Sequence, residues 1–103
     1  MIEKIDVKTV SINSLNYDIS IVEKPSIGNE IKDGVINFSD TTIQINKDVS
    51  LERAKEILAH EIIHGLFEGM AINNEENVER VTERLLNFIK LNKRVLDFLG
   101  DRL

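Results

Sequence analysis

The stretch from Ser50 to Gly69, SLERAKEILAHEIIHGLFEG, is the most strongly patterned part of the 103-residue chain. Apolar residues recur in it at intervals of three and four, which is the spacing of one buried face of a helix. Ser50 is a favourable N-cap residue, and Gly69 is a residue that commonly ends a helix. We therefore predict a helix over residues 50–68 that packs one face against a core. The residues of that face are Leu51, Ala54, Ile57, Leu58, Ile62 and Leu66.

Upstream of this helix, apolar residues alternate with polar ones, which is the period of a strand. The alternation runs through Ile5–Thr9 and Tyr17–Ile21, and a polar hairpin turn is expected between them at Ser11–Asn16. Two more short strands are predicted at Gly34–Phe38 and Thr42–Asn46. Residues 1–48 are thus expected to form a short antiparallel sheet of three or four strands.

Downstream, a second amphipathic helix is predicted over residues 74–99, which either runs on unbroken or breaks near Asn92. Asn73 and Asn74 are expected to cap it. Its C-terminal segment, Val95–Leu99, is apolar enough to cover a core or to mediate a dimer, and the oligomeric state stays open. Strands followed by helices are typical of an α+β domain, and residues 1–103 have the length of one domain.

Composition excludes several classes of protein. The chain is 42% hydrophobic and 30% charged, and its net charge of −5 comes with no basic patch, which argues against nucleic acid as a partner. No apolar run is long enough for a membrane span, and the N-terminus lacks the pattern of a signal peptide, so a cytoplasmic protein is expected. Because the chain has no cysteine, any metal has to be held by His, Asp or Glu.

The only two histidines of the chain, His60 and His64, lie four residues apart in the predicted helix. This spacing puts both imidazoles on one face, one turn apart, where they can bind the same ion. Glu61 follows the first histidine, and HEIIH matches the zinc-binding motif in which that glutamate is the general base for a water activated by the metal. The alternative is an ordinary pair of histidines, but burying these groups without a ligand would be costly.

A catalytic zinc needs a third protein ligand, and without a third histidine that ligand has to be a carboxylate. If the two predicted helices are antiparallel neighbours, the first residues of the second helix face His60 and His64. Glu75 is then the preferred ligand, with Glu79 and Glu76 as alternatives. Glu79, one turn beyond Glu75, is also placed to hydrogen-bond a ligating imidazole from outside the metal site and to fix its tautomer.

These two helices carry a resemblance to a known family. The segments LAHEIIHG (residues 58–65) and EENVERVTERLL (residues 75–86) resemble the ImmA/IrrE-like metallopeptidases, which are gluzincins of bacteria, phages and mobile elements. The second family motif is Glu-x-x-Ala-Asn/Asp-x-Phe-Ala-x-x-Leu-Leu, and its first glutamate, the third zinc ligand, falls on Glu75. The resemblance covers about residues 50–91. The positions that depart from the motif are Val78, Glu79, Val81 and Thr82.

The resemblance implies a small zincin-like domain of the phage or prophage type that binds one Zn²⁺ per chain and hydrolyses peptide bonds in a protein substrate. The expected location is the cytoplasm of a bacterium or of a phage-infected host. Glu61 would be the catalytic base. The residues that the resemblance assigns to the metal are His60, His64 and Glu75.

The resemblance also gives the strand Thr42–Asn46 a role, because in zincins an edge strand before the metal helix pairs with an extended substrate. Tyr17 would be the only available donor to an oxyanion, since the larger gluzincins use a downstream Tyr or His that this chain lacks. The alternative to an enzyme is a non-catalytic module that binds a protein partner and keeps a structural or vestigial zinc site.

Overall fold

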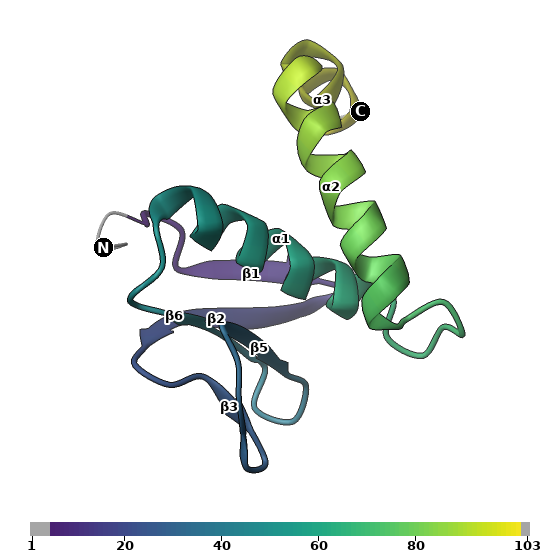
Figure 1. Ribbon diagram of the computed structural model, residues 1–103. Coiled ribbons are helices and arrows are strands. Elements are labelled where there is room, and N and C mark those ends of the chain that lie inside the picture. Colours follow the sequence, from purple (N-terminus) through teal and green to yellow (C-terminus); the bar gives the residue numbers. More distant parts are fainter. Residues whose placement is uncertain (1–4, 102–103) are drawn as a thin grey trace.

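The computed structural model describes residues 5–101, in which strands precede helices as the sequence predicts, although there are six strands and three helices instead of three or four strands and two helices (Figure 1). The strands are β1 (Thr9–Ile12), β2 (Leu15–Val22), β3 (Ser26–Ile27), β4 (Glu30–Ile31), β5 (Gly34–Asn37) and β6 (Thr42–Asn46). The helices are α1 (Leu51–Leu66), α2 (Glu75–Leu91) and α3 (Lys93–Leu99). The α+β class is therefore confirmed. Residues 1–4 of the predicted N-terminal sheet lie outside the described part. No helix between residues 5 and 101 has the length and apolar character needed to cross a bilayer.

The main sheet is mixed rather than antiparallel, with the strand order β1-β2-β6-β5. Hairpins join β1 to β2 and β5 to β6 in antiparallel fashion, but β2 and β6 pair in parallel, with Ile19 opposite Ile43 and Ile21 opposite Ile45. The prediction of an all-antiparallel sheet was wrong because the long connection after β2 lets the chain return as a second hairpin whose last strand runs beside β2. Strand periodicity records which residues face the core and carries no information on this pairing.

The same topology overturns the prediction that Thr42–Asn46 is an edge strand. This segment is β6, which is paired with β2 on one side and β5 on the other, so its backbone is used within the sheet. Its side chains Ile43 and Ile45 are both 0% exposed, as expected for an interior strand. The free edges of the sheet are β1 and β5.

The first hairpin is longer and tighter than predicted. Strands β1 and β2 extend into the region expected to be a turn, and only Asn13 and Ser14 connect them. Both residues have positive φ, 50° and 72°, which matches the twist that a two-residue hairpin turn requires. The loop after β2 also contains a small hairpin, β3–β4, that the sequence did not predict.

Helix α1 covers one face of the sheet (Figure 1) and contributes Ala54 and Ile57 to the buried core. Ser50 caps its N-terminus, where the side-chain oxygen accepts a hydrogen bond from the Arg53 N–H at 3.1 Å. Four residues of the predicted stripe, Ala54, Ile57, Leu58 and Ile62, pack on the sheet, whereas Leu51 and Leu66 at its two ends are 42% and 44% exposed. Each fully buried aliphatic side chain contributes roughly 1.5–3 kcal/mol to folding. The buried residues of the core are Ile12, Tyr17, Ile36, Ile43, Ile45, Ala54 and Ile57.

Helix α2 contacts α1 at its N-terminal end and then extends away from the sheet (Figure 1). Its cap is Asn74, whose side chain accepts a hydrogen bond from the Asn77 N–H at 3.0 Å. The helix ends at Leu91, and Asn92 has non-helical dihedral angles before α3 begins, so of the two alternatives that the sequence left open the helix takes the break near Asn92. Helix α1 ends at Leu66, two residues earlier than predicted.

The contact between α1 and β5 yields a prediction about stability. A Cβ atom at Gly34 would overlap Ile57 Cγ2 and lie 3.3 Å from Glu61 Oε2. We expect Gly34→Ala to lower the free energy of unfolding by about 1–3 kcal/mol, because a well-packed interface has to shift to accept the methyl group. Urea unfolding measures the change.

The matched control is Gly100→Ala. A Cβ atom there meets only the Leu96 carbonyl oxygen, at an ordinary 3.4 Å, and Gly100 has a negative φ of −91°. Its substitution should change stability by less than about 0.5 kcal/mol. Equal effects of the two substitutions would contradict the close approach of α1 to β5.

Candidate metal centre

The two histidines of α1 and the first residue of α2 converge at one point. His60 and His64 lie on the same face of α1, with ring centroids 4.8 Å apart. Glu75 opens α2, and the connection through residues 67–74 turns the chain back so that its carboxylate meets both rings. One oxygen lies 3.2 Å from His60 Nε2 and the other 2.6 Å from His64 Nε2. The candidate ligand atoms of the three residues all lie within 4.8 Å of one another, close enough to hold a metal ion.

The donor set suits a small divalent cation. Two imidazole nitrogens and one carboxylate are the ligands of many catalytic zinc sites, which leave a fourth position open. At zinc–ligand bonds of about 2.0–2.1 Å, tetrahedral ligand atoms lie roughly 3.3 Å apart. The His60–Glu75 separation of 3.2 Å already has that value, and the 2.6 Å between His64 and Glu75 would open by roughly 0.7 Å. These two distances end at different oxygens of Glu75, and with one ligand atom from each residue the three atoms lie within 4.8 Å of one another, so the side chains would have to close around a bound metal ion.

Asn73 is a residue of the site whose role sequence reasoning missed. It was expected to cap α2, but Asn74 does this alone. The Oδ1 atom of Asn73 lies 2.7 Å from His64 Nδ1, and its Nδ2 donates to the His64 carbonyl oxygen at 3.4 Å. When Nδ1 carries the proton and donates it to Asn73, the Nε2 atom that faces Glu75 is free to bind a metal. The sequence did carry a signal for this role. A helix needs only one N-cap residue, so the second of the two adjacent asparagines was available for another contact.

Glu61 lies beside the triad in a different environment. It points inward from α1 toward β5 and is only 7% exposed. Burial raises the pKa of Glu61 to about 7, and the charge of Glu75 acts in the same direction. The charge of His64, a backbone hydrogen bond from Ile36 and the charge of Lys32 oppose this rise. The carboxyl group is therefore poised to exchange a proton near neutral pH.

The titration of the candidate ligands favours the protonation states that a metal needs. Burial lowers the pKa of His60, so its ring is neutral at physiological pH. Burial acts to raise the pKa of Glu75, but the hydrogen bonds and charges of His64 and His60 outweigh it and hold that pKa below its ordinary value. A neutral imidazole and an ionised carboxylate are both ready to ligate.

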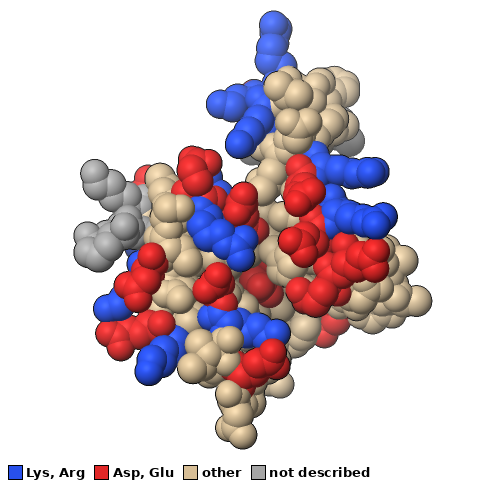
Figure 2. Space-filling view, viewed as in Figure 1, with Lys and Arg blue, Asp and Glu red and all other residues tan. Residues whose placement is uncertain are grey.

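A cleft of about 750 Å³ opens beside these residues, between α1, α2 and the free edge of β5. Figure 2 shows Asp and Glu side chains gathered where α1 and α2 approach each other. The walls of the cleft also carry positive charge. Its acidic and basic lining residues include Lys32, Arg53, Glu56, Glu79 and Glu83.

The structure separates the three glutamates considered for the third ligand. Glu75 meets both imidazoles, whereas Glu76 pairs with Arg80 at 3.1 Å. Glu79 lines the cleft, and its negative charge acts to raise the pKa of His60. Among residues 5–101, however, the hydrogen bonds to the imidazoles come from Asn73 and Glu75 and not from Glu79, so Asn73 holds the position expected of Glu79.

Tyr17 cannot act in this cleft. Its side chain is 2% exposed and lies in the core, with its ring edge-to-face against Phe38 at 6.4 Å. The expectation that Tyr17 donates to an oxyanion is therefore wrong. The reason is the side of β2 on which Tyr17 lies, because its side chain faces α1 together with the other core residues of the sheet.

Comparison of the chain with protein-family models, with curated proteins and with solved structures found no match. The resemblance to ImmA/IrrE-like metallopeptidases thus rests on the residues of α1 and α2 alone.

Metal binding by substituted proteins tests this site. We expect one zinc per chain in the wild type, loss of zinc in His64→Ala and Glu75→Ala, and retention in Glu76→Gln and Glu79→Gln, which keep all three ligands. Asn73→Ala should weaken zinc binding by about 10–100-fold, because the proton on His64 is no longer directed to Nδ1. Mass spectrometry of metal content and competition with a chelator measure both effects. Zinc retained by Glu75→Ala would rule out this ligand set.

The buried Glu61 yields a prediction for the metal-free protein. Its pKa is about 7 in the fold against 4.5 in the unfolded chain, so between these pH values the folded state binds more protons. The stability of the wild type should therefore fall as pH rises from 4.5 to 7. Glu61→Gln removes this titration and should gain about 2–4 kcal/mol relative to the wild type over that range.

Urea unfolding of both metal-free proteins at pH 4.5, 6 and 8 measures this change. Titrating groups that do not interact with Glu61 are common to the two proteins and cancel in the comparison. A difference in stability that stays constant with pH would contradict the burial of the ionised Glu61 carboxylate.

Proposed function

We propose that this protein is a zinc-dependent metallopeptidase that hydrolyses peptide bonds in a protein substrate. The observation that carries the proposal is the position of the triad. His60, His64 and Glu75 converge beside a buried Glu61, and all four side chains line one cleft that borders an open sheet edge. An ordinary surface ion pair between His and Glu side chains would need neither a buried carboxylate beside it nor a cleft wide enough for a peptide.

Three residues would hold the metal. Zinc bound by His60, His64 and Glu75 would lower the pKa of a water molecule to about 7 and polarise a substrate carbonyl. Asn73 keeps the His64 ring in the orientation and tautomer that binding needs. Burial lowers the pKa of His60, which keeps that imidazole neutral at physiological pH.

Glu61 is assigned to proton transfer. Its carboxylate accepts a proton from the attacking water and passes that proton to the nitrogen of the leaving amine. Burial raises the pKa of this carboxyl group, so its ionised form is a stronger base than an exposed carboxylate. The hydrogen bond from the Ile36 backbone holds the carboxylate against β5.

Substrate would bind along β5 rather than along β6. Strand β5 pairs with β6 on one side only, and Gly34, Val35 and Ile36 line the cleft. An extended peptide beside them gains main-chain hydrogen bonds without needing a particular sequence. Lys32 lines the same cleft, and its charge acts on Glu61 and Glu75, so Lys32 replaces Tyr17 as our candidate for stabilising an oxyanion.

Hydrolysis of a randomised fluorogenic peptide library by the zinc-loaded protein tests the proposal. We expect Glu61→Gln to lower the rate by about 10²–10⁴-fold, because general base catalysis is lost, while zinc content stays at the wild-type level. Glu76→Gln is the matched control and should keep full activity, because Glu76 points away from the metal ligands to Arg80. Equal rates for Glu61→Gln and the wild type would overturn the mechanism.

A binding module with a non-catalytic zinc site is the second candidate. The observation that favours it lies outside the cleft, in the exposed apolar side chains Phe98 and Leu99 of α3, which are 78% and 68% exposed. This candidate predicts no hydrolysis of any library peptide by the zinc-loaded wild type, together with a gain in stability when zinc binds.

A further inference from the structure

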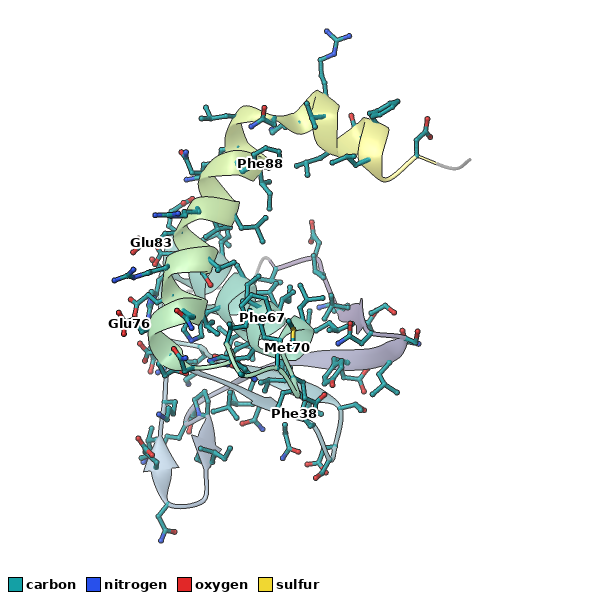
Figure 3. The ribbon with its side chains drawn as sticks, turned by 90° about the vertical axis from the view of Figure 1, so that its right-hand side faces the viewer. Phe38, Phe67, Met70, Glu76, Glu83 and Phe88 are labelled. Carbon is teal, nitrogen blue, oxygen red and sulfur yellow. The ribbon has the colours of Figure 1, made fainter. Side chains whose placement is uncertain are left out.

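Two carboxylates on the α2 wall of the cleft are not paired with a cation. Glu79 and Glu83 lie about one and two turns beyond Glu75, and both line the cleft. Figure 3 shows Glu83 on the side of α2 opposite Phe88, a residue that does not line the cleft. Among residues 5–101, neither Glu79 nor Glu83 takes part in an ion pair or a side-chain hydrogen bond.

The cations of the cleft are mostly engaged. Among the described residues, four Lys and Arg side chains line the cleft, and three of them are held by carboxylates. The fourth is Lys90, which lies about 10 Å beyond Glu83 along the axis of α2, away from the metal ligands. A divalent ion at the triad would be offset by Glu75 and Glu61 and would leave Glu79 and Glu83 unpaired. The three ion pairs are Lys32–Glu30, Arg53–Glu56 and Lys55–Glu52.

Helix geometry places the two unpaired carboxylates next to the metal ligands. With a rise of 1.5 Å per residue, Glu79 lies about 6 Å and Glu83 about 12 Å along the helix axis from Glu75. The charge of Glu79 acts on His60, which agrees with this position. An extended peptide advances about 3.3 Å per residue, and Lys and Arg carry their charge on long side chains. A basic side chain close to the cleaved bond can therefore reach these carboxylates.

We propose that the cleft selects peptides with a lysine or arginine within two residues of the cleaved bond, and that Glu79 and Glu83 determine this specificity. The inference rests on the proposed peptidase function, because the metal ligands and the free edge of β5 bring a peptide into the cleft.

The two walls of the cleft would then have different tasks. Pairing of the peptide backbone along β5 holds any sequence, so a preference among side chains has to come from other parts of the cleft. A cation beside Glu79 and Glu83 is attracted without an existing ion pair having to break. A carboxylate in the same place meets two like charges, which adds to the discrimination.

Hydrolysis of matched peptides tests the proposal. The probes are fluorogenic peptides on one scaffold sequence that the zinc-loaded wild type cleaves, with Lys, Gln or Glu placed in turn at each position. We expect kcat/KM to be about tenfold higher for Lys than for Glu within two residues of the cleaved bond, because two exposed carboxylates each contribute a factor of a few. Positions farther away should show no preference. Equal values for Lys and Glu at every position would overturn the proposal.

Charge reversal on α2 should reverse the preference. Glu79→Lys and Glu83→Lys should each lower the ratio of Lys to Glu hydrolysis, and the double variant should prefer Glu, all measured at equal zinc content. The matched control is Glu68→Lys, which makes the same charge change at an exposed residue outside the cleft and should keep the wild-type ratio. A double variant with the wild-type ratio, or a Glu68→Lys protein with the same change, would overturn the assignment.

Binding separates this proposal from the peptidase function. Fluorescence anisotropy measures the binding of labelled Ala–Gly peptides that carry Lys or Glu to zinc-loaded Glu61→Gln. We expect the Lys peptide to bind about tenfold more tightly, and the added substitutions Glu79→Lys and Glu83→Lys to remove the difference.

The outcomes are distinct. No cleavage of any peptide by the wild type would overturn the peptidase function, and the anisotropy would then decide the specificity on its own. Equal dissociation constants for the Lys and Glu peptides would overturn the specificity. A second zinc per chain that Glu83→Lys removes would also overturn it, because the two carboxylates would then hold a metal ion.

Discussion

Helix α1 lies on the sheet at a point where only a glycine leaves room for it. The missing side chain at Gly34 lets Ile57 and Glu61 approach the β5 backbone directly. This contact sets the depth of α1 in the fold and brings one carboxylate against a strand edge. It also leaves the neighbouring face of α1, with His60 and His64, turned outward to meet α2. The site thus depends on a packing constraint that no ligand residue itself supplies.

The consequence is a conflict between packing and charge at Glu61. Burial that helps the core makes the ionised form of this carboxylate costly, and the pKa of about 7 expresses that cost. A backbone hydrogen bond from Ile36 and the charge of Lys32 reduce the cost without removing it. A buried carboxyl group with a raised pKa lowers the stability of the metal-free protein but favours proton transfer. Strongly shifted pKa values of this kind are common at active sites.

Helix α2 serves two purposes along its length. Its first turn is tied to α1 by the Glu75 carboxylate and by Asn73 of the connection, so the ligand comes from the best-anchored part of the helix. Its last turns and α3 leave the domain and carry apolar side chains outward.

Local patterns in the chain were enough to predict α1, the start of α2 and the convergence of His60, His64 and Glu75, whereas they left open whether the second helix breaks at Asn92. These features depend on spacings of three and four residues and on one short connection, which act within a few turns of helix. The mixed sheet, the interior position of β6, the free edge of β5, the burial of Tyr17 and the partner of His64 were decided only in the folded structure. Each depends on contacts between segments far apart in the chain, and a strand's period says which side faces the core but not which neighbour it pairs with.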